Sequence, residues 1–179
     1  KQILTIPNLL SMFRILLIPL IVWLYCGRQD YPLAAWVLLL SGATDIADGF
    51  IARRFHMVSD LGKVLDPIAD KLTQTAALIC LLTRFPAIWW LLGVLVMKET
   101  FMAIMGLLVI RRTGAVYSAA WHGKLATCVL YAVILAHIVW YAIPQPVSAV
   151  LVLAGAASIL LSLVLYTIAD LRRIRAGRS

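Results

Sequence analysis

Long apolar runs separated by short polar segments dominate this 179-residue chain. Six of the runs approach or exceed the roughly 20 residues with which a helix crosses the hydrocarbon core of a bilayer. Apolar and polar residues do not alternate within these runs, and this favours helices over strands. The pattern predicts an all-α, polytopic membrane protein with six transmembrane helices, placed at residues 8–26, 33–53, 66–83, 86–110, 120–142 and 146–169.

The composition also indicates that the bilayer, and not water, surrounds most of the chain. Hydrophobic residues make up 63% of it and charged residues 13%, whereas soluble domains are roughly 45–50% apolar and about 25% charged. So much apolar surface cannot be hidden in one aqueous core. Because no internal repeat and no long linker interrupts the predicted helices, we expect a single membrane domain over residues 1–179.

The basic residues collect on one side of the predicted helical bundle, whereas the loops of the other side carry only Arg28 and Arg84. Because cytoplasmic loops are enriched in Lys and Arg, we expect an inner or plasma membrane protein with both termini in the cytoplasm. The net charge of +8 then reflects topology and contact with anionic headgroups, not nucleic-acid binding. The cytoplasmic set comprises Lys1, Arg53, Arg54, Lys63, Arg111, Arg112, Lys124, Arg172, Arg173, Arg175 and Arg178.

Acidic residues are scarce, and five of the eight fall between Asp45 and Asp70. Asp45 and Asp48 are three residues apart and share one helical face, as do Asp66 and Asp70, which are four apart. A short polar loop between the second and third predicted helices returns the chain antiparallel. The two acidic faces can therefore converge at the cytoplasmic ends of these helices, where the active site is expected.

Four converging carboxylates need positive charge, because like charges repel and desolvation disfavours ions. Arg53 and Lys71 are the nearest basic side chains in the sequence, and they are too few. Hard oxygen ligands suit Mg²⁺ or Mn²⁺, and two such ions about 3.5–4 Å apart could clamp the oxygens of a phosphoryl displacement. Tight helix packing would explain Gly49 but no aspartate, and intramembrane ionisable residues are functional by default.

The aspartates belong to a longer pattern, D-x2-D-G-x2-A-R-x8-G-x3-D-x3-D, which resembles the signature of the CDP-alcohol phosphatidyltransferases. Its eight fixed positions are filled by Asp45, Asp48, Gly49, Ala52, Arg53, Gly62, Asp66 and Asp70. The resemblance implies that the four aspartates bind the metal ions and that Asp70 is also the general base. It implies contacts to the CDP-lipid from Gly49, Ala52, Arg53 and Gly62.

The resemblance also implies a reaction. The metal ions would bind the pyrophosphate of CDP-diacylglycerol, a hydroxyl acceptor would attack the lipid-linked phosphorus, and CMP would leave. The resemblance further suggests a homodimer.

Two segments bear on the acceptor. Residues 6–14, with Pro7, Asn8, Ser11 and Arg14, resemble the Pro-Asn-x-x-Thr-x-x-Arg opening of phosphatidylglycerophosphate synthases, and residues 121–124 resemble their Trp-x-Gly-Lys. Glycerol 3-phosphate is then the expected acceptor. We expect its phosphate to be bound from the set Asn8, Arg14, Arg111, Arg112 and Lys124.

Other residues leave alternatives open. Gly106, Ala126 and Leu130 stand where such synthases usually carry polar side chains, which favours a cardiolipin synthase that uses phosphatidylglycerol as the acceptor. Lys98 and Glu99 resemble an Arg-Glu pair of the family, or they simply neutralise each other. A divalent-cation transporter would also use intramembrane aspartates, but its site usually lies near the midplane. A non-catalytic relative has no need of four intact aspartates.

Overall fold

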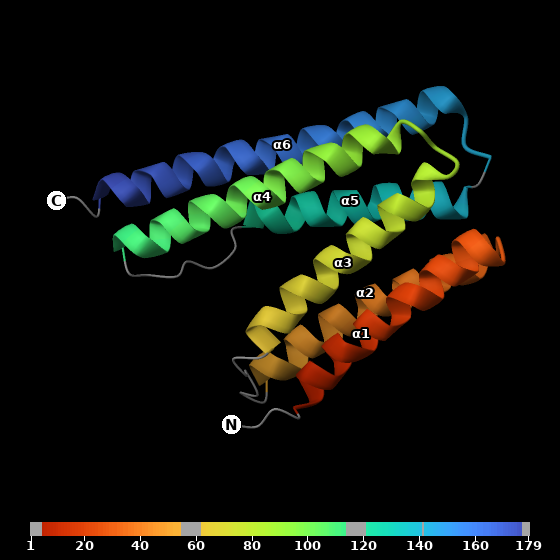
Figure 1. Ribbon diagram of the computed structural model, residues 1–179, viewed down its shortest axis with the longest axis horizontal. Helices are drawn as coiled ribbons and strands as arrows, with labels where there is room; N and C mark the ends of the chain where they lie inside the picture. The colour runs from red at the N-terminus through yellow and green to blue at the C-terminus, as the bar shows by residue number, and fades with distance from the viewer. Residues whose placement is uncertain (1–4, 55–61, 114–120, 141, 177–179) are drawn as a thin grey trace. The chain divides into compact units, whose positions relative to one another are not determined.

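The computed structural model describes residues 5–54, 62–113, 121–140 and 142–176, and all regular secondary structure within these ranges is helical. This confirms the all-α prediction. The elements are α1 (Ile6–Val22), a π-helical turn η1 (Trp23–Gly27), α2 (Tyr31–Arg54), α3 (Gly62–Leu82), α4 (Ile88–Thr113), α5 (Trp121–Val139) and α6 (Gln145–Ala176) (Figure 1).

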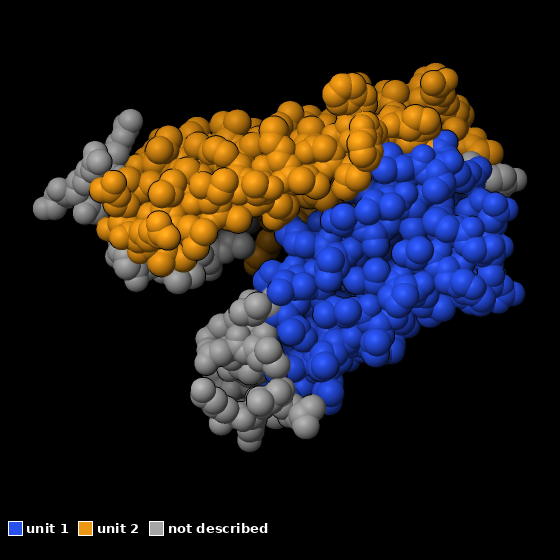
Figure 2. All heavy atoms as spheres, viewed as in Figure 1, with its two compact units in different colours: residues 1–84, 135–141 blue, residues 85–134, 142–179 orange. Residues whose placement is uncertain are grey.

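The chain forms two compact units, shown in different colours in Figure 2. Unit 1 comprises residues 1–84 and 135–141, and unit 2 comprises residues 85–134 and 142–179. In unit 1, α1 packs against both α2 and α3, and in unit 2, α4 packs against α6. All four predicted aspartates lie in unit 1.

One face of α1 is buried along its length. The start of the helix is set locally, because Thr5 is extended and its side chain accepts a hydrogen bond from the Asn8 amide, while Pro7 occupies the first turn. From there the buried residues recur every third or fourth position, as a helical face requires. The face is polar in its first half and apolar in its second, and it continues into η1. We call it the α1 stripe: Asn8, Ser11, Arg14, Leu17 and Ile21 of α1, and Leu24 of η1.

Small buried residues on α2 and α3 allow close helix packing. α2 buries Ala34 and Ala35, and α3 buries Ala69 and Ala77, and such residues let helix backbones approach in membranes. The end of unit 1 remote from the aspartates is held by a different contact. There the Tyr25 and Tyr31 rings meet edge to face, and the Arg84 guanidinium lies over the Tyr31 ring at 4.7 Å.

In unit 2, two glycines accept large side chains from other helices. A Cβ atom at Gly155 would lie 3.2 Å from the Leu91 side chain, and one at Gly123 would lie 2.4 Å from the Tyr166 hydroxyl. Lys98 and Glu99, also in this unit, form an ion pair with an Nζ–Oε1 distance of 2.7 Å. The two opposite charges are therefore paired with each other, and a role in the site stays a prediction.

Three helical segments are long and apolar enough to cross a membrane: Pro7–Gly27, Ile88–Arg112 and Gln145–Arg172. Gly123–Val139 is a shorter apolar helix. α2 and α3 have comparable lengths, but their halves nearer the connecting loop carry the aspartates and several basic residues. The described helices therefore support a membrane protein with three clear spans, and the count of six remains a prediction.

The close contact between Gly123 and the Tyr166 side chain predicts that adding one methyl group at Gly123 lowers the stability of the protein. Gly123→Ala should destabilise the detergent-solubilised protein by about 1–3 kcal/mol, because the new methyl group overlaps the Tyr166 ring and forces it to move. Gly106→Ala is the matched control: no atom within 4 Å opposes its Cβ, so it should be neutral or gain up to about 1 kcal/mol of helix propensity. Thermal unfolding measures both, and equal effects would contradict the steric argument. In the Tyr166→Ala background, Gly123→Ala should cost nothing further.

Candidate active site

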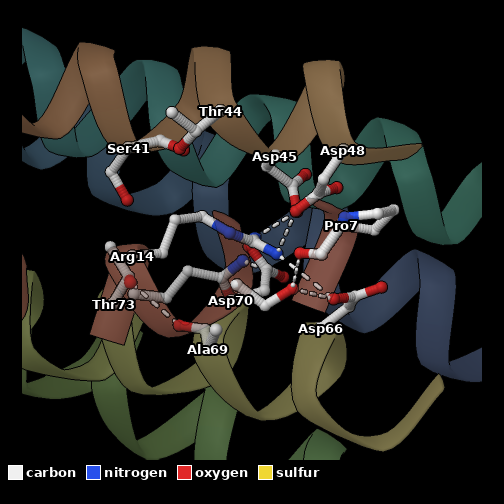
Figure 3. Close-up of polar contacts among 12 residues, drawn as sticks. Pro7, Arg14, Ser41, Thr44, Asp45, Asp48, Asp66, Ala69, Asp70 and Thr73 are labelled. Atoms are coloured by element: carbon white, nitrogen blue, oxygen red, sulfur yellow. Dashed lines mark hydrogen bonds and ion pairs between the residues drawn. The ribbon is translucent and has the colours of Figure 1, made fainter. Parts of the chain in front are cut away.

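Arg14 of α1 joins the aspartates of α2 and α3. Its side chain is only 2% exposed, and its two terminal nitrogens contact three carboxylates. Nη1 pairs with Asp45 Oδ1, while Nη2 lies 2.9 Å from Asp48 Oδ2 and 3.6 Å from Asp66 Oδ1. Figure 3 shows the guanidinium between side chains from α2 and side chains from α3. The predicted convergence of the two acidic faces is therefore present, and a buried cation lies at its centre.

Ser11, one turn before Arg14, also belongs to this cluster. Its hydroxyl has two acceptors, Asp66 Oδ1 and the Pro7 carbonyl oxygen at 3.0 Å. Because Ser11 and Arg14 are three residues apart on the α1 stripe, one helical face delivers both groups to Asp66. The polar half of the stripe is thus explained by the carboxylates that it meets.

Asp70 lies one turn after Asp66 and has a separate partner. Its Oδ2 accepts a hydrogen bond of 2.9 Å from Gln74 Nε2. Gln74 is buried, and its Oε1 has no hydrogen-bond partner among the described residues. Since one Asp70 oxygen is engaged by Gln74, the carboxylate orientation is set by a side chain of its own helix.

The carboxylates differ in exposure, and this gives the cluster a closed side and an open side. The Asp48 side chain is 3% exposed, whereas those of Asp45 and Asp66 are 46% and 39% exposed. Asp48 therefore lies at the closed side beside Arg14. A ligand can approach from the side of Asp45 and Asp66.

The donor set suits a divalent cation in its chemistry. One guanidinium cannot balance three carboxylates, and carboxylate oxygens are the ligands that Mg²⁺ and Mn²⁺ prefer. As the side chains lie, no group of three or more Asp, Glu, His or Cys residues in the described ranges is arranged to hold a metal ion. Instead, the oxygens of Asp45, Asp48 and Asp66 are turned toward Arg14.

Arg14 is a partner of the aspartates that the sequence analysis did not identify. Arg53 and Lys71 are nearest to them in the sequence, but Arg14 contacts three of them although it is 31–52 residues away. Arg14 was also expected to be available to an acceptor phosphate, which does not fit a buried guanidinium with both terminal nitrogens paired. The available signal was the three-residue spacing of Asn8, Ser11 and Arg14 within an apolar run, which places them on one face.

The other predicted site residues are less fully defined. Gly49, Ala52 and Arg53 lie in the last turns of α2, but their side-chain surroundings are outside the described part, as are residues 55–61, which include His56. Gly62 is buried at the start of α3. Asn8 is buried on the α1 stripe. The remaining acceptor candidates belong to unit 2 and are exposed at helix ends, namely Arg111, Arg112 and Lys124.

Comparison with known proteins shows the family to which the sequence is similar. The CDP-alcohol phosphatidyltransferase family model matches residues 4–168. A cardiolipin synthase (CMP-forming) of Streptomyces coelicolor is 41% identical over 109 residues, which cover 58% of this chain and 51% of that protein. The alignment thus spans about half the length of the Streptomyces protein.

Two further relatives carry a different name. A CDP-diacylglycerol–glycerol-3-phosphate 3-phosphatidyltransferase of Bacillus subtilis is 36% identical over 137 residues, or 68% of this chain and 70% of that protein. A probable phosphatidylglycerophosphate synthase of Mycobacterium tuberculosis is 33% identical over 160 residues, or 87% of this chain and 76% of that protein.

The difference in exposure predicts unequal effects of equal substitutions. Asp48→Ala should destabilise the protein by about 3–5 kcal/mol, because it leaves the Arg14 charge buried without its closest well-shielded partner. Asp45→Ala should cost about 1 kcal/mol or less, because that carboxylate is half exposed and solvent replaces part of its interaction. Denaturant unfolding in detergent measures both variants. Equal losses would show that burial does not decide the strength of these pairs.

Proposed function

Because the chain belongs to the CDP-alcohol phosphatidyltransferase family, we propose that it transfers the phosphatidyl group of CDP-diacylglycerol to glycerol 3-phosphate and releases CMP. The observation that carries the proposal is the convergence of the motif aspartates of α2 and α3 on one side of unit 1. The names of the Bacillus and Mycobacterium relatives support glycerol 3-phosphate as the acceptor.

The metal is part of this proposal. Asp45, Asp48, Asp66 and Asp70 would hold one or two Mg²⁺ or Mn²⁺ ions. When bound, such ions neutralise the pyrophosphate of the donor and stabilise the charge that develops on the transferring phosphoryl group. The support is the oxygen donor set and its open side at Asp45 and Asp66, and the cluster has more negative charge than Arg14 can balance.

The chain's own residues divide the remaining work. The acceptor oxygen forms a bond to the phosphatidyl phosphorus, the bond from that phosphorus to the CMP oxygen breaks, and the acceptor proton passes to Asp70. Gln74 Nε2 donates to Asp70 Oδ2 at 2.9 Å, and this hydrogen bond would orient the carboxylate that takes the proton. Gly49, Ala52, Arg53 and Gly62 would contact the cytidine diphosphate of the donor.

Membrane placement follows from the same interpretation. We place α2, α3 and α5 across the membrane beside the three clear spans, which gives six spans in an inner or plasma membrane. Both termini and the aspartates then face the cytoplasm, where glycerol 3-phosphate is available. Arg111, Arg112 and Lys124, exposed at the ends of α4 and α5, would steer and bind the acceptor phosphate. A homodimer is part of the proposal only through the resemblance of the motif.

A cardiolipin synthase is the second candidate, in which phosphatidylglycerol is the acceptor. The Streptomyces relative has that name. In addition, Ala126 and Leu130 are buried apolar residues of α5 where polar groups were expected for a phosphorylated acceptor. A lipid acceptor would enter from the bilayer and would need fewer cationic contacts.

One assay tests the reaction, the acceptor and the metal. The purified chain in detergent with CDP-diacylglycerol and Mg²⁺ should release CMP when glycerol 3-phosphate is added. Chelation should abolish release and fresh Mg²⁺ should restore it, because carboxylates alone repel a pyrophosphate. Release with phosphatidylglycerol but not with glycerol 3-phosphate would transfer the assignment to the cardiolipin synthase. No release with either acceptor would refute both.

The role of Asp70 predicts a specific kinetic change. Asp70→Asn should lower kcat by about 10²–10⁴ and change the KM for CDP-diacylglycerol by much less, because a general base acts in the transition state. Asp30→Asn, an acid at the other end of unit 1 that caps α2, is the control and should retain its kcat. Steady-state CMP release measures both variants. A loss of donor affinity without a loss of kcat would show that Asp70 is not the base.

A further inference from the structure

We propose that Arg14 is a built-in counter-ion that competes with the divalent cation for Asp45 and Asp66. In this view the guanidinium partly offsets the carboxylate charge when no metal is bound, and metal binding requires it to release the two exposed carboxylates while it keeps Asp48. The proposal rests on the proposed function, because it assumes that the aspartates bind a divalent cation.

The first support is that Arg14 and the metal would use the same oxygens. Arg14 Nη1 contacts Asp45 Oδ1 and Nη2 reaches Asp66 Oδ1, and these carboxylates form the open side of the cluster. A metal ion arriving from that side meets oxygens already engaged by a cation. When the metal ion binds, it therefore replaces the guanidinium as the cation in contact with Asp45 and Asp66.

The second support is the unequal strength of the contacts. The Nη2–Asp48 Oδ2 distance is 2.9 Å and both side chains are buried, whereas the Nη2–Asp66 Oδ1 distance is 3.6 Å and Asp66 is substantially exposed. A buried, well-shielded pair is costly to break, and an exposed pair is not. Arg14 can therefore remain anchored on Asp48 Oδ2 while it withdraws from the other carboxylates.

The third support is that Arg14 is not fully hydrogen-bonded. Its Nε is buried and has no hydrogen-bond partner within the described residues. A guanidinium held only through its terminal nitrogens can shift without losing a third contact. The same side chain cannot leave the site for water, because it is among the most completely buried large side chains of the protein.

The counter-ion explains how the cluster tolerates the absence of metal. Without Arg14, the three carboxylates would lose the cation that contacts all of them, and the folded state would depend more on metal. With Arg14, part of the carboxylate charge is compensated even without metal, but metal affinity is lower because two ion-pair contacts must be given up. Removing the charge should therefore change stability and affinity in opposite directions.

The experiment measures metal binding and unfolding of the full chain without reference to activity. Arg14→Gln removes the charge but keeps hydrogen-bond donors, and Arg28→Gln is the control, since Arg28 is exposed and contacts the Trp23 ring at the other end of α1. Mn²⁺ is the probe, with its dissociation constant measured by electron paramagnetic resonance in detergent. Thermal unfolding is recorded with chelator and with saturating Mn²⁺.

The expected result is that Arg14→Gln binds Mn²⁺ about tenfold tighter than the unsubstituted chain. It should unfold at a lower temperature in chelator and recover most of the difference in Mn²⁺. Arg28→Gln should change neither quantity. Unchanged or weaker Mn²⁺ binding by a folded Arg14→Gln variant overturns the proposal.

If Arg14→Gln does not fold even with Mn²⁺, Arg14→Lys decides: one ammonium cannot replace two guanidinium nitrogens, so tighter Mn²⁺ binding supports competition and an unchanged constant overturns it. If neither the unsubstituted chain nor any variant binds Mn²⁺, the metal part of the proposed function fails as well. Mn²⁺ binding that is insensitive to Arg14 refutes the counter-ion alone.

Discussion

A buried arginine among carboxylates is the constraint on which unit 1 depends. A charge that is removed from water must be paired, and the guanidinium of Arg14 can satisfy that requirement only where α2 and α3 both present their aspartates. This fixes the axial position and the rotation of α1 relative to its neighbours. The apolar half of the α1 stripe then packs in a register that the polar half has determined. Packing alone would tolerate other registers, but an unpaired charge would not.

The two halves of the α1 stripe have different roles. Near the start of α1 the stripe meets carboxylates that can exchange partners, and toward η1 the residues of the stripe are themselves apolar. The Tyr25, Tyr31 and Arg84 contacts close that second end. Like charges repel each other, so the packing of the surrounding helices must hold the carboxylates together. The second half of unit 1 provides that support, and the aspartates can consequently stay close together.

Much of this arrangement was predictable because it is local in the sequence. Apolar runs located all six described α-helices to within a few residues, apart from α3, which starts four residues earlier, and α6, whose polar end continues the helix to Ala176. Hydropathy identifies the apolar part of a helix, and a helix can continue into polar sequence beyond it. The spacing of Asp45 with Asp48 and of Asp66 with Asp70 correctly placed them on facing surfaces. Arg14 was missed as their partner because its ion pairs join distant segments, and no local rule assigns such a pair. The acceptor residues stay undetermined for the same reason, since they belong to unit 2.

The position of Arg14 within the first apolar segment has a consequence for how the protein is made. α1 emerges from the ribosome before either acidic helix, and a segment that enters the bilayer alone would place an unpaired arginine in it, at a cost of about 2.5–3.5 kcal/mol at mid-membrane on insertion scales. Near the end of the span the side chain can reach the headgroups, which reduces that cost. Once α2 and α3 are inserted, the Arg14 charge that opposed insertion of α1 favours association of α1 with these two helices. Assembly of the acidic cluster is thereby coupled to the insertion of α1, α2 and α3. A chain in which one of these helices is not inserted cannot form the cluster.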